Sequence, residues 1–590
     1  MILQALAEYY RALERDGKIS APGWSPVKVS FALCLGEDGT LEQVLPLQTE
    51  QSRGRKTFLA PQQIVLPAPV KRTAGVAANF LCDNSGYMLG IDNKGKPQRT
   101  RECFLACKEL HEQLLGGVNS PAARSILAFF RTWEPEKAAE NTFLAEDWKG
   151  ILSGGNLIFR TADGFAHDDP AIRQAWENHY NRSSDGIQGV CLVTGELGPV
   201  ESVHPAIKNV AGAQSSGAAL VSFNAPAFCS YGKEQSLNAP TGKYAAFAYT
   251  AALNYLLADR DHVFRVGDAT VVCWARGGGD LYQSLFSYAA MGQTEPAYDE
   301  NDLRNMVKQL CQGNPVTYQE EKLDPDMDFY VLGLSPNAAR LSVRFFLRNT
   351  FGNFLRNIQA HQERLEIVRP AYDKFETLPV WKLLSETVNQ NARDKSPAPG
   401  LAGEVLRAIL DNSLYPATLL NGATLRIRAE REVTRGRAAI LKAYYKKLEE
   451  TAKRENPDIP EEVLCVSLNE NSSNVPYTLG RLFSVLEAIQ AAANPGINAT
   501  IKDKYFNSAA STPAVIFPIL INLAQKHLKK LKGTNMGLTV FYDKQLTDLC
   551  GRMGENYPAH MNLPQQGSFQ LGYYHQTQAR YQKKEEKGNV

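Results

Sequence analysis

Residues 328–347 read DFYVLGLSPNAARLSVRFFL, and the fold of the surrounding chain follows from this stretch. Two runs rich in aliphatic and aromatic residues, 328–335 and 339–347, are separated by Pro336-Asn337. Strand-forming runs joined by a short turn-forming segment are typical of a β-hairpin. The sequence therefore predicts antiparallel strands in the middle of the chain.

The second strand of this hairpin is predicted to have one apolar and one basic face. Alternation places four apolar side chains on the core face: Leu341, Val343, Phe345 and Leu347. The opposite face carries Arg340, Ser342, Arg344 and Phe346, and Arg348 continues it. Guanidinium groups beside an exposed aromatic ring suit phosphate contact combined with stacking on a base or sugar. A solvated sheet face that binds nothing fits the same pattern equally well.

The pattern on either side of the hairpin predicts an α+β protein. Apolar residues at helical spacing indicate helices, whereas alternating or short apolar runs indicate strands. The predicted helices cover 2–14, 100–115, 244–257 and 350–367, and the predicted strands cover 27–35, 41–47, 189–196, 219–223 and 271–276. From Val380 onward helical periodicity dominates, with apolar stripes in 475–491 and in a helix between Pro513 and Gly533.

These patterns divide the chain into three expected parts. The N-terminal part, 1–370, is a mixed α/β region with antiparallel hairpins. A basic helical connecting region follows over 371–465, and a helical bundle covers 466–590. We expect the DNA-recognition chemistry, if present, to lie in the first part.

The composition limits the classes of partner. The 590 residues include 64 Lys plus Arg and 62 Asp plus Glu, and the net charge of +2 is too small to attract a polyanion through the field of the whole protein. Nucleic-acid contacts must then come from local clusters. The ten cysteines include no CxxC pair, so we expect a reducing, cytoplasmic location. No apolar run approaches the roughly 18 residues that span a bilayer, and we expect no membrane contact.

Sequence motifs of common enzymes are missing. The chain contains no GxxxxGK[ST], HExxH or GxSxG motif. Cys103, Cys107 and His111 share one face of a predicted helix and offer three zinc ligands, but no fourth ligand is evident. Two thiols on one helix face are more often part of a buried apolar stripe. We therefore expect no metal and no cofactor.

A second group of side chains has the residue types of a magnesium-dependent nuclease. It consists of Asp259, Asp261, His262 and Asp268. Arg260 and Arg265 interrupt the group, and acids beside arginines at a helix end are usually solvated or paired. A nuclease is therefore an alternative interpretation and not the favoured one.

Two basic clusters occur in the second half of the chain. Residues 421–455 contain ten basic and five acidic residues, and Arg428, Arg435 and Lys442 are candidate phosphate contacts there. Lys526, Lys529 and Lys530 lie on one side of the helix that starts near Pro513. Of these, Lys526 and Lys530 are candidate phosphate contacts, although surface lysines are usually only solubilising.

The segment 212–240 reads GAQSSGAALVSFNAPAFCSYGKEQSLNAP and combines small residues with amides and hydroxyls. Six of its side chains are candidate donors to the O2 and N3 acceptors of a DNA minor groove: Gln214, Ser215, Ser216, Lys233, Gln235 and Asn238. A glycine-rich loop packed between strands, in which amides cap backbone groups, is an equally good interpretation.

Long stretches of the chain resemble one protein family. They are NFLCDNSGYMLGID (79–92), CLVTGE (191–196), the segment 212–240, FAYTAALNYLL (247–257), LGLSPNAARLSVRFF (332–346), YTLGRLFSVLEAIQ (477–490) and PAHMNLPQQGSFQLGYYHQ (558–576). Together with the opening MILQALAEYY, they resemble the large subunit of the type I-C CRISPR surveillance complex, Cascade. The resemblance runs in order over nearly the whole chain.

The resemblance implies a non-catalytic function. A subunit of this family recognises the protospacer-adjacent motif on double-stranded DNA, helps to open the duplex and stabilise the R-loop, and recruits a helicase-nuclease. The implied partners are crRNA, target DNA with its displaced non-target strand, and the backbone, crRNA-handle-binding and small subunits of Cascade. A metal-dependent nuclease and a pure assembly scaffold are the alternatives.

The resemblance transfers a role only to the segment 212–240; the choice of residues within it rests on their donor chemistry, and the roles that follow are a hypothesis of mechanism. The segment 212–240 is expected to contact the motif, with Lys71, Arg72 and Asn79 as neighbours. Arg340, Arg344 and Arg348 are expected to hold phosphates nearby, and the C-terminal candidates to line the path of the displaced strand. In this family the C-terminal part resembles a small subunit that can be made by internal translation, and Val466 is a candidate start if GTG encodes it.

Overall fold

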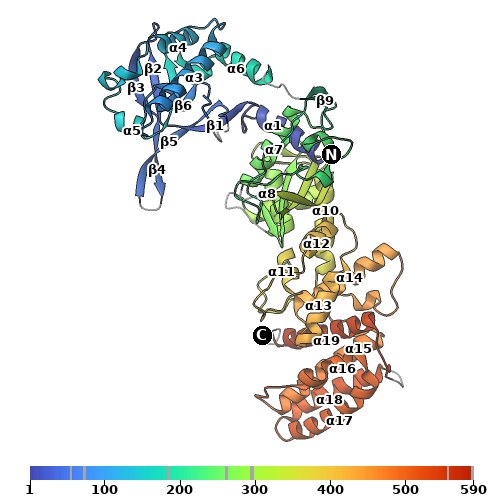
Figure 1. Cartoon of the computed structure of the whole chain (residues 1–590). Helices are drawn as coiled ribbons and strands as arrows, with labels where there is room; N and C mark the ends of the chain where they lie inside the picture. The colour runs from blue at the N-terminus through green and yellow to red at the C-terminus, as the bar shows by residue number, and fades with distance from the viewer. Residues whose placement is uncertain are drawn as a thin grey trace. The chain divides into compact units, whose positions relative to one another are not determined.

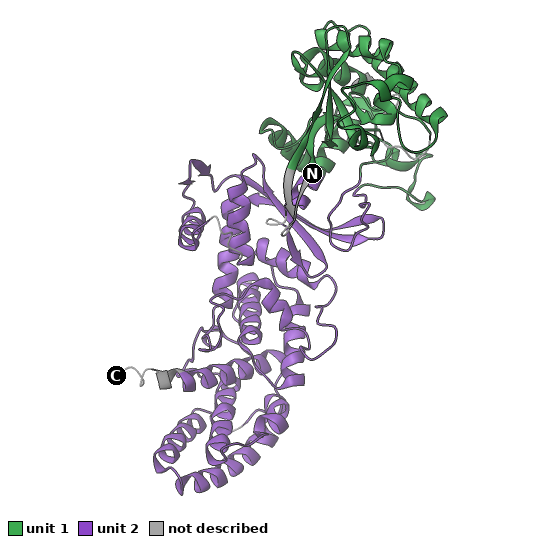
Figure 2. Cartoon of the chain, turned by 90° about the vertical axis from the view of Figure 1, so that its left-hand side faces the viewer, with its two compact units in different colours: residues 1, 3–205, 221–252 green, residues 2, 206–220, 253–590 purple. Residues whose placement is uncertain are grey.

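The computed structural model describes residues 1–53, 56–70, 75–182, 187–259, 263–292, 298–553 and 557–585, and for 50–53, 56–59, 181–182 and 582–585 the backbone alone. The chain forms two compact units and passes between them more than once (Figure 2). Unit 1 comprises residues 1, 3–205 and 221–252, and unit 2 comprises residues 2, 206–220 and 253–590. Each unit has its own hydrophobic core.

Two sheets form the framework of unit 1 (Figure 1). The larger has the order β3-β2-β7-β6 and is made of β2 (Phe31–Leu35), β3 (Leu41–Pro46), β6 (Cys82–Asn84), β7 (Asn156–Thr161) and the short β8 (Gly164–Phe165), which pairs with β7. The smaller has the order β1-β5-β4 and is made of β1 (Trp24–Val29), β4 (Gln48–Arg53) and β5 (Lys56–Pro67). The antiparallel pairing of β2 with β3 confirms the predicted N-terminal hairpin.

Helices and a small β-ribbon complete unit 1. The helices are α1 (Ile2–Arg15), α2 (Ser85–Met88), α3 (Pro97–Leu115), α4 (Pro121–Thr132), α5 (Trp148–Leu152), α6 (Pro170–Arg182) and the beginning of α7 (Lys243–Ala258). The ribbon pairs β9 (Gln188–Val190) with β10 (Leu197–Pro199). Phe129, Phe130 and Phe159 pack ring against ring in the core, with centroids 5.4–5.7 Å apart.

An antiparallel four-stranded sheet lies at the start of unit 2. Its order is β11-β12-β15-β16, with β11 (Phe264–Val266), β12 (Ala269–Ala275), β15 (Asp328–Asn337) and β16 (Arg340–Thr350). A separate ribbon pairs β13 (Val316–Tyr318) with β14 (Glu321–Leu323). The β15–β16 pairing confirms the hairpin predicted from residues 328–347.

A β-bulge changes the predicted faces of β16. Gly333 is opposite Phe345 and Leu334 is opposite Val343, so Arg344 is the extra residue between them. Leu341, Phe345 and Leu347 are buried as predicted, but Val343 is 41% exposed. Phe346, on the face predicted to be basic and open, stacks on Tyr330 at 5.9 Å and is half-buried. The alternation rule fails here because the bulge interrupts the two-residue period.

Helices make up the rest of unit 2. They are α8 (Asp280–Met291), α9 (Glu300–Cys311), α10 (Phe351–Leu365), α11 (Val380–Ser385), α12 (Leu401–Leu410), α13 (Ala417–Glu430), α14 (Arg435–Ala452), α15 (Val475–Ala493), α16 (Ile501–Ser511), α17 (Pro513–Lys532), α18 (Met536–Gly551) and α19 (Leu563–Glu585). One continuous core runs from Phe264 in the sheet to Tyr574 in the last helix.

Helices α15 and α19 pack closely together, and glycines allow the approach. A methyl group on Gly480 would overlap the carbonyl oxygen of Phe569, and one on Gly572 would overlap that of Tyr477. Small residues at a helix contact bring the backbones together and bury more of the neighbouring side chains. The strings containing these glycines, 477–490 and 558–576, are therefore spatial partners.

Most predicted elements are confirmed, and the α+β class with them. Three strands were wrong in extent. The predicted strand 27–35 is divided at Ser30 between β1 and β2, which belong to different sheets. Of 189–196 only Gln188–Val190 is a strand before the chain turns, and 219–223 forms a single bridge, from Ala219 to Arg340. The apolar runs in 189–196 and 219–223 therefore do not form the full strands that they predicted. In 189–196 several of the apolar side chains are exposed, as described below.

The division into parts 1–370, 371–465 and 466–590 differs from the division into two units, because the core of unit 2 crosses residues 370 and 465. The boundaries at residues 370 and 465 stay predictions about which part of the chain performs which function. Within the described residues, no helix combines the length and the apolar character needed to cross a membrane.

Candidate nucleic-acid interface

A closed loop of unit 2 holds three of the predicted motif-reading residues. Ile207 N donates to Ala218 O at 2.9 Å and Ala218 N donates to Ile207 O at 2.8 Å, which closes the loop. The next residue continues onto the hairpin: Ala219 N donates to Ala339 O at 2.9 Å, and Ala219 O accepts from Leu341 N at 3.0 Å. The loop is therefore joined by backbone hydrogen bonds to the turn between β15 and β16.

Side chains of neighbouring elements fix the course of this loop. Ala211 N donates to Thr270 Oγ1 on β12 at 3.1 Å. Asn254 on α7 accepts from Lys208 N at 2.8 Å and donates to Ala206 O at 3.1 Å. Because these contacts satisfy backbone groups on the first arm, and the pairing of Ile207 with Ala218 holds the second, the loop has a defined conformation without a ligand.

The tip of the loop presents polar side chains to solvent. Gly217 N donates to Gln214 O at 2.9 Å, and the turn leaves Gln214, Ser215 and Ser216 exposed. Gly217 has φ +96°, and a Cβ at this position would lie 2.8 Å from Ile207 O. A residue with a side chain would strain this turn. The structure thus brings together three donors that the sequence predicted.

The surroundings of this tip are basic. Lys208, which sequence reasoning missed, is exposed on the same loop, and Arg340 pairs through its backbone with Ala219 at the base. The stretch 202–233 contains no aspartate or glutamate, a signal that the sequence does carry. A polyanion therefore meets donors and cations here without a competing carboxylate from this stretch.

The remainder of the predicted segment, 221–240, belongs to unit 1. Asn238 is used structurally: its Oδ1 accepts from Ser230 N at 2.8 Å, and its Nδ2 donates to Lys233 O at 3.0 Å and to Gln235 O at 2.9 Å. The interpretation that amides cap backbone groups is thus correct for Asn238. Lys233 and Gln235 themselves are exposed.

Tyr231 is a candidate that the sequence analysis overlooked. It lies in the turn braced by Asn238, has a positive φ of 55°, and is 98% exposed. A large ring held in solvent by a braced turn suits stacking on a base. The sequence offered only the neighbouring glycine and lysine as a signal.

One further motif-reading candidate, Asn79, belongs to unit 1. Lys71 and Arg72 fall outside the described residues. Asn79 is half-buried, and its Oδ1 accepts from Val70 N at 3.0 Å, which makes its side chain a brace for the backbone. Unit 1 also contains a cavity of about 420 Å³, and Lys94, Lys96 and Arg99 are among the residues that line it. The sequence analysis did not single out these three residues.

The arginines of β16 are exposed or half-buried, and two of them have carboxylate partners. Arg344 Nη2 donates to Asp268 Oδ2 at 2.7 Å, and Arg348 donates to both carboxylate oxygens of Asp328 at 3.2 and 2.9 Å. Exposed ion pairs of this type contribute about 0–1 kcal/mol, so a phosphate group can compete for the guanidinium. Arg344 and Arg348 remain candidate phosphate contacts together with Arg340.

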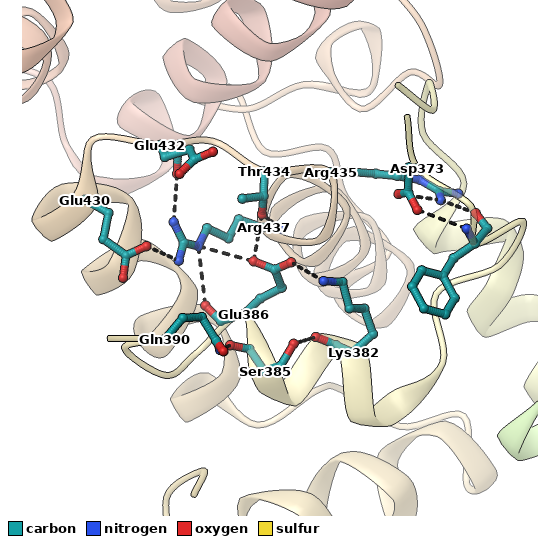
Figure 3. A network of polar contacts seen from close by, with 11 residues as sticks. Asp373, Lys382, Ser385, Glu386, Gln390, Glu430, Glu432, Thr434, Arg435 and Arg437 are labelled. Atoms are coloured by element: carbon teal, nitrogen blue, oxygen red, sulfur yellow. Dashed lines mark hydrogen bonds and ion pairs between the residues drawn. The ribbon is translucent and has the colours of Figure 1, made fainter. Parts of the chain in front are cut away.

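Four of the ten basic residues of the cluster 421–455 are buried, namely Arg435, Arg437, Lys442 and Lys447, and Figure 3 shows the polar contacts of the first two. Arg435 donates to Asp373 Oδ2 at 3.0 Å and to the carbonyl oxygens of Phe375 and Glu376. Lys442 is 1% exposed and donates to Arg364 O at 3.1 Å. The prediction that Arg435 and Lys442 contact phosphate is not compatible with this burial, because the protein's own oxygens occupy their donors.

The remaining basic candidates are at the surface. Arg428 is exposed and donates to Gln566 Oε1 at 2.7 Å. Lys526, Lys529 and Lys530 are exposed on α17, and Lys530 donates to Asn494 Oδ1 at 2.7 Å. The phosphate-contact candidates of the C-terminal part therefore reduce to Arg428, Lys526 and Lys530.

The zinc interpretation of Cys103, Cys107 and His111 has no support. His111 is fully buried, its Nδ1 lies 2.7 Å from Cys107 O, and its Nε2 accepts from Leu81 N at 3.1 Å. Burial lowers the pKa of His111 to about 4, so the ring is neutral. Both ring nitrogens face backbone groups, and this residue is part of the core of unit 1.

The group suggested for magnesium is only partly described. Asp261 and His262 lie outside the described residues, and Asp268 pairs with Arg344. Among the residues that the structure describes, no three metal-ligating side chains gather in one place.

Comparison with known proteins gives the family. The model of the family described as CRISPR-associated protein (Cas_Csd1) matches residues 6–581. A search of curated proteins finds no match to the chain. Because the matched range covers nearly all of the 590 residues, this chain belongs to the Cas_Csd1 family of CRISPR-associated proteins.

Proposed function

We propose that this chain is the non-catalytic large subunit of a crRNA-guided type I-C Cascade, and that it reads the protospacer-adjacent motif on double-stranded DNA. The observation that carries the proposal is the closed polar loop around Gln214, which is fixed to the β15–β16 hairpin and lies in a stretch without carboxylates. The membership in a CRISPR-associated family and the resemblance of its long strings to that subunit support it.

The loop supplies the chemistry of minor-groove reading. Gln214 and the hydroxyls of Ser215 and Ser216 donate to base-edge acceptors, and Lys233 and Gln235 are further donors in unit 1. Tyr231 stacks on a base at the step where the strands separate. In this proposal the donors recognise the base edges and the Tyr231 ring helps to open the duplex. Neither step breaks a covalent bond.

Phosphate contacts orient the duplex and the displaced strand. Arg340, Arg344 and Arg348 hold phosphates beside the loop, because β16 begins where the loop is attached. Arg428, Lys526 and Lys530 line the path of the displaced non-target strand along the bundle. The complex then acts in the cytoplasm with crRNA and the other Cascade subunits, stabilises the R-loop and recruits the helicase-nuclease.

The variant Gln214→Ala, Lys233→Ala tests motif reading. In a reconstituted complex it is expected to lower the preference for a correct motif over a mutated one by at least about tenfold, because a good base-edge contact contributes roughly 1–3 kcal/mol of discrimination and about 1.4 kcal/mol is a factor of ten. Assembly with crRNA stays unchanged. Electrophoretic mobility shifts with both duplexes measure the preference.

The matched control is Gln113→Ala, which removes an exposed amide of α3 outside the loop and leaves the preference intact. Unchanged motif discrimination in the loop variant contradicts the assignment. Equal duplex binding by complexes with and without this chain favours a scaffold, and cleavage of DNA by the purified chain with Mg²⁺ favours a nuclease.

The lysines of α17 are expected to act on all sequences alike. Lys526→Glu with Lys530→Glu lowers the affinity of the complex for target DNA regardless of motif, and it reduces the slope of log K against log salt by about one for each lysine. Fluorescence anisotropy across a salt series measures the slope. Lys308→Glu on α9, also an exposed lysine, is the control. A slope equal to that of the wild type excludes this surface from DNA contact.

A further inference from the structure

The ribbon of unit 1 displays an apolar surface to solvent. Leu197 is 76% exposed and lies directly opposite Val190, which is 55% exposed, so the two side chains share one face of the ribbon. Leu192 in the following turn is 65% exposed, and Ile187 just before the ribbon is 62% exposed. We call these four residues the aliphatic patch. Single exposed leucines are ordinary, but four exposed aliphatic side chains within eleven residues are an unusual concentration of apolar surface.

Hydrogen bonds hold the aliphatic patch in place. Cys191 N donates to Glu196 O at 2.9 Å, and the thiol of Cys191 accepts from the N–H groups of Val193 and Thr194 at 3.4 Å. Leu192 N donates to Pro240 O at 2.9 Å. A two-stranded ribbon is marginal by itself, so these contacts explain why its apolar side chains stay outward and do not collapse onto the unit.

A cavity of about 650 Å³ adjoins the ribbon within unit 1. Its walls come from α1, α6, β10 and the start of α7, and Leu197 of the aliphatic patch lines it. The walls contain the aromatic rings of Tyr180, Tyr244 and Phe247. Aromatic residues are enriched in protein–protein interfaces, so these rings beside exposed apolar side chains favour a protein partner.

The charge of this cavity is acidic. Its walls contain the carboxylates of Glu14, Glu177 and Glu196. Among the described residues that line it, Lys243 is the only basic one, and its Nζ lies 4.3 Å from the centroid of the Tyr180 ring and donates to Tyr180 O. Three carboxylates repel a phosphate backbone and attract a cation. This charge favours a cationic protein side chain over nucleic acid as the occupant.

We propose that the aliphatic patch and the acidic cavity together form a docking surface for another protein subunit, which inserts a lysine or arginine side chain into the cavity and covers the patch with aliphatic residues beside it. This proposal rests on the proposed function in one respect: the partner is expected to be a subunit of the same complex. It is separate from motif reading, because no residue of the loop around Gln214 lines this cavity.

Photo-crosslinking identifies what covers the patch. A benzophenone amino acid replaces Leu197 in the full chain, and the complex is assembled with crRNA and the other subunits, bound to target DNA and irradiated. We expect a crosslink to another subunit, mapped by mass spectrometry to a peptide in which a lysine or arginine adjoins aliphatic residues. The control position is Leu105, an exposed leucine on α3 outside the patch, which gives no such crosslink.

Charge reversal provides the second measurement. Glu177→Lys with Glu196→Lys is expected to weaken retention of this chain in the complex at least tenfold, and the opposite substitution of the crosslinked basic residue restores it. Glu109→Lys, an exposed carboxylate of α3, leaves retention unchanged. The absence of rescue contradicts the pairing of cavity and cation even if the crosslink forms.

The outcomes separate this inference from the proposed function. A crosslink to DNA or crRNA, to a second copy of this chain, or to no molecule overturns the docking surface, whether or not the same complex still discriminates the motif. Conversely, a mapped crosslink with normal rescue upholds the docking surface even if the complex shows no motif preference, in which case only the proposed function fails.

Discussion

Replacing Arg437 with alanine is expected to lower the free energy of unfolding of unit 2 by about 3–5 kcal/mol, because it breaks a buried ion pair by removing one partner. Arg437 is 2% exposed, and its guanidinium donates to Glu432 O at 3.0 Å and lies 3.4 Å from the carboxylate of Glu386 (Figure 3). It also reaches the carboxylate of Glu430. Without it, the side chains of Lys382 and Thr434 are the polar partners that the described part of the chain leaves to the buried Glu386 carboxylate.

The matched control for Arg437→Ala is Arg407→Ala on α12. Arg407 is exposed and lies 3.6 Å from Asp411 one turn away, so its removal is expected to cost less than about 1 kcal/mol. Urea unfolding of the full chain, followed by circular dichroism of the helices, compares the two. Equal midpoints for the two variants contradict the structural role of Arg437.

Lys442 is expected to make the stability of unit 2 depend on pH in the alkaline range. Burial lowers the pKa of its ammonium to about 8, and Lys446 adds to the effect, whereas Glu366 and Cys465 oppose it. The pKa in the unfolded chain is higher, so the unfolded state binds more protons and the folded state becomes more stable as pH rises between the two pKa values.

The variant Lys442→Met removes this dependence. Relative to Lys442→Met, the wild type is expected to gain about 2–3 kcal/mol between roughly pH 7 and pH 10. The lost hydrogen bonds to Glu363 O and Arg364 O change the stability by a constant amount and do not affect the difference. Urea unfolding at both pH values measures it. Lys529→Met, an exposed lysine, is the control, and a similar pH difference in both variants contradicts a depressed pKa at Lys442.

These two residues show why the basic cluster 421–455 misled the sequence analysis. Its positive charge is real, but Arg435, Arg437 and Lys442 face segments far away in the chain. Asp373 is 62 residues from Arg435, and Glu386 is 51 residues from Arg437. A count of charges within a window has no information on such partners, so it cannot separate an exposed basic surface from an internal ion-pair network.

The closed polar loop around Gln214 was predictable in part. Its composition of small residues, amides and hydroxyls singled out Gln214, Ser215 and Ser216, and these are exposed on one turn. The same composition also selected Asn238, which braces the backbone of its own turn, and passed over Tyr231. Donor chemistry alone does not tell whether an amide serves the backbone or a ligand, because both uses need the same atoms.

What the sequence determined by itself is the local structure and the family. Periodicity fixed the hairpin over 328–347, the helix α1 and the long helices of the bundle, since it reports contacts between residues two to four positions apart. The tertiary structure alone decided which cations are buried, where the bulge at Arg344 turns the strand, and how the segment 212–240 is shared between two units. These outcomes depend on packing between residues that are tens to hundreds of positions apart. Packing over such separations is not visible in the spacing of neighbouring residues in the sequence.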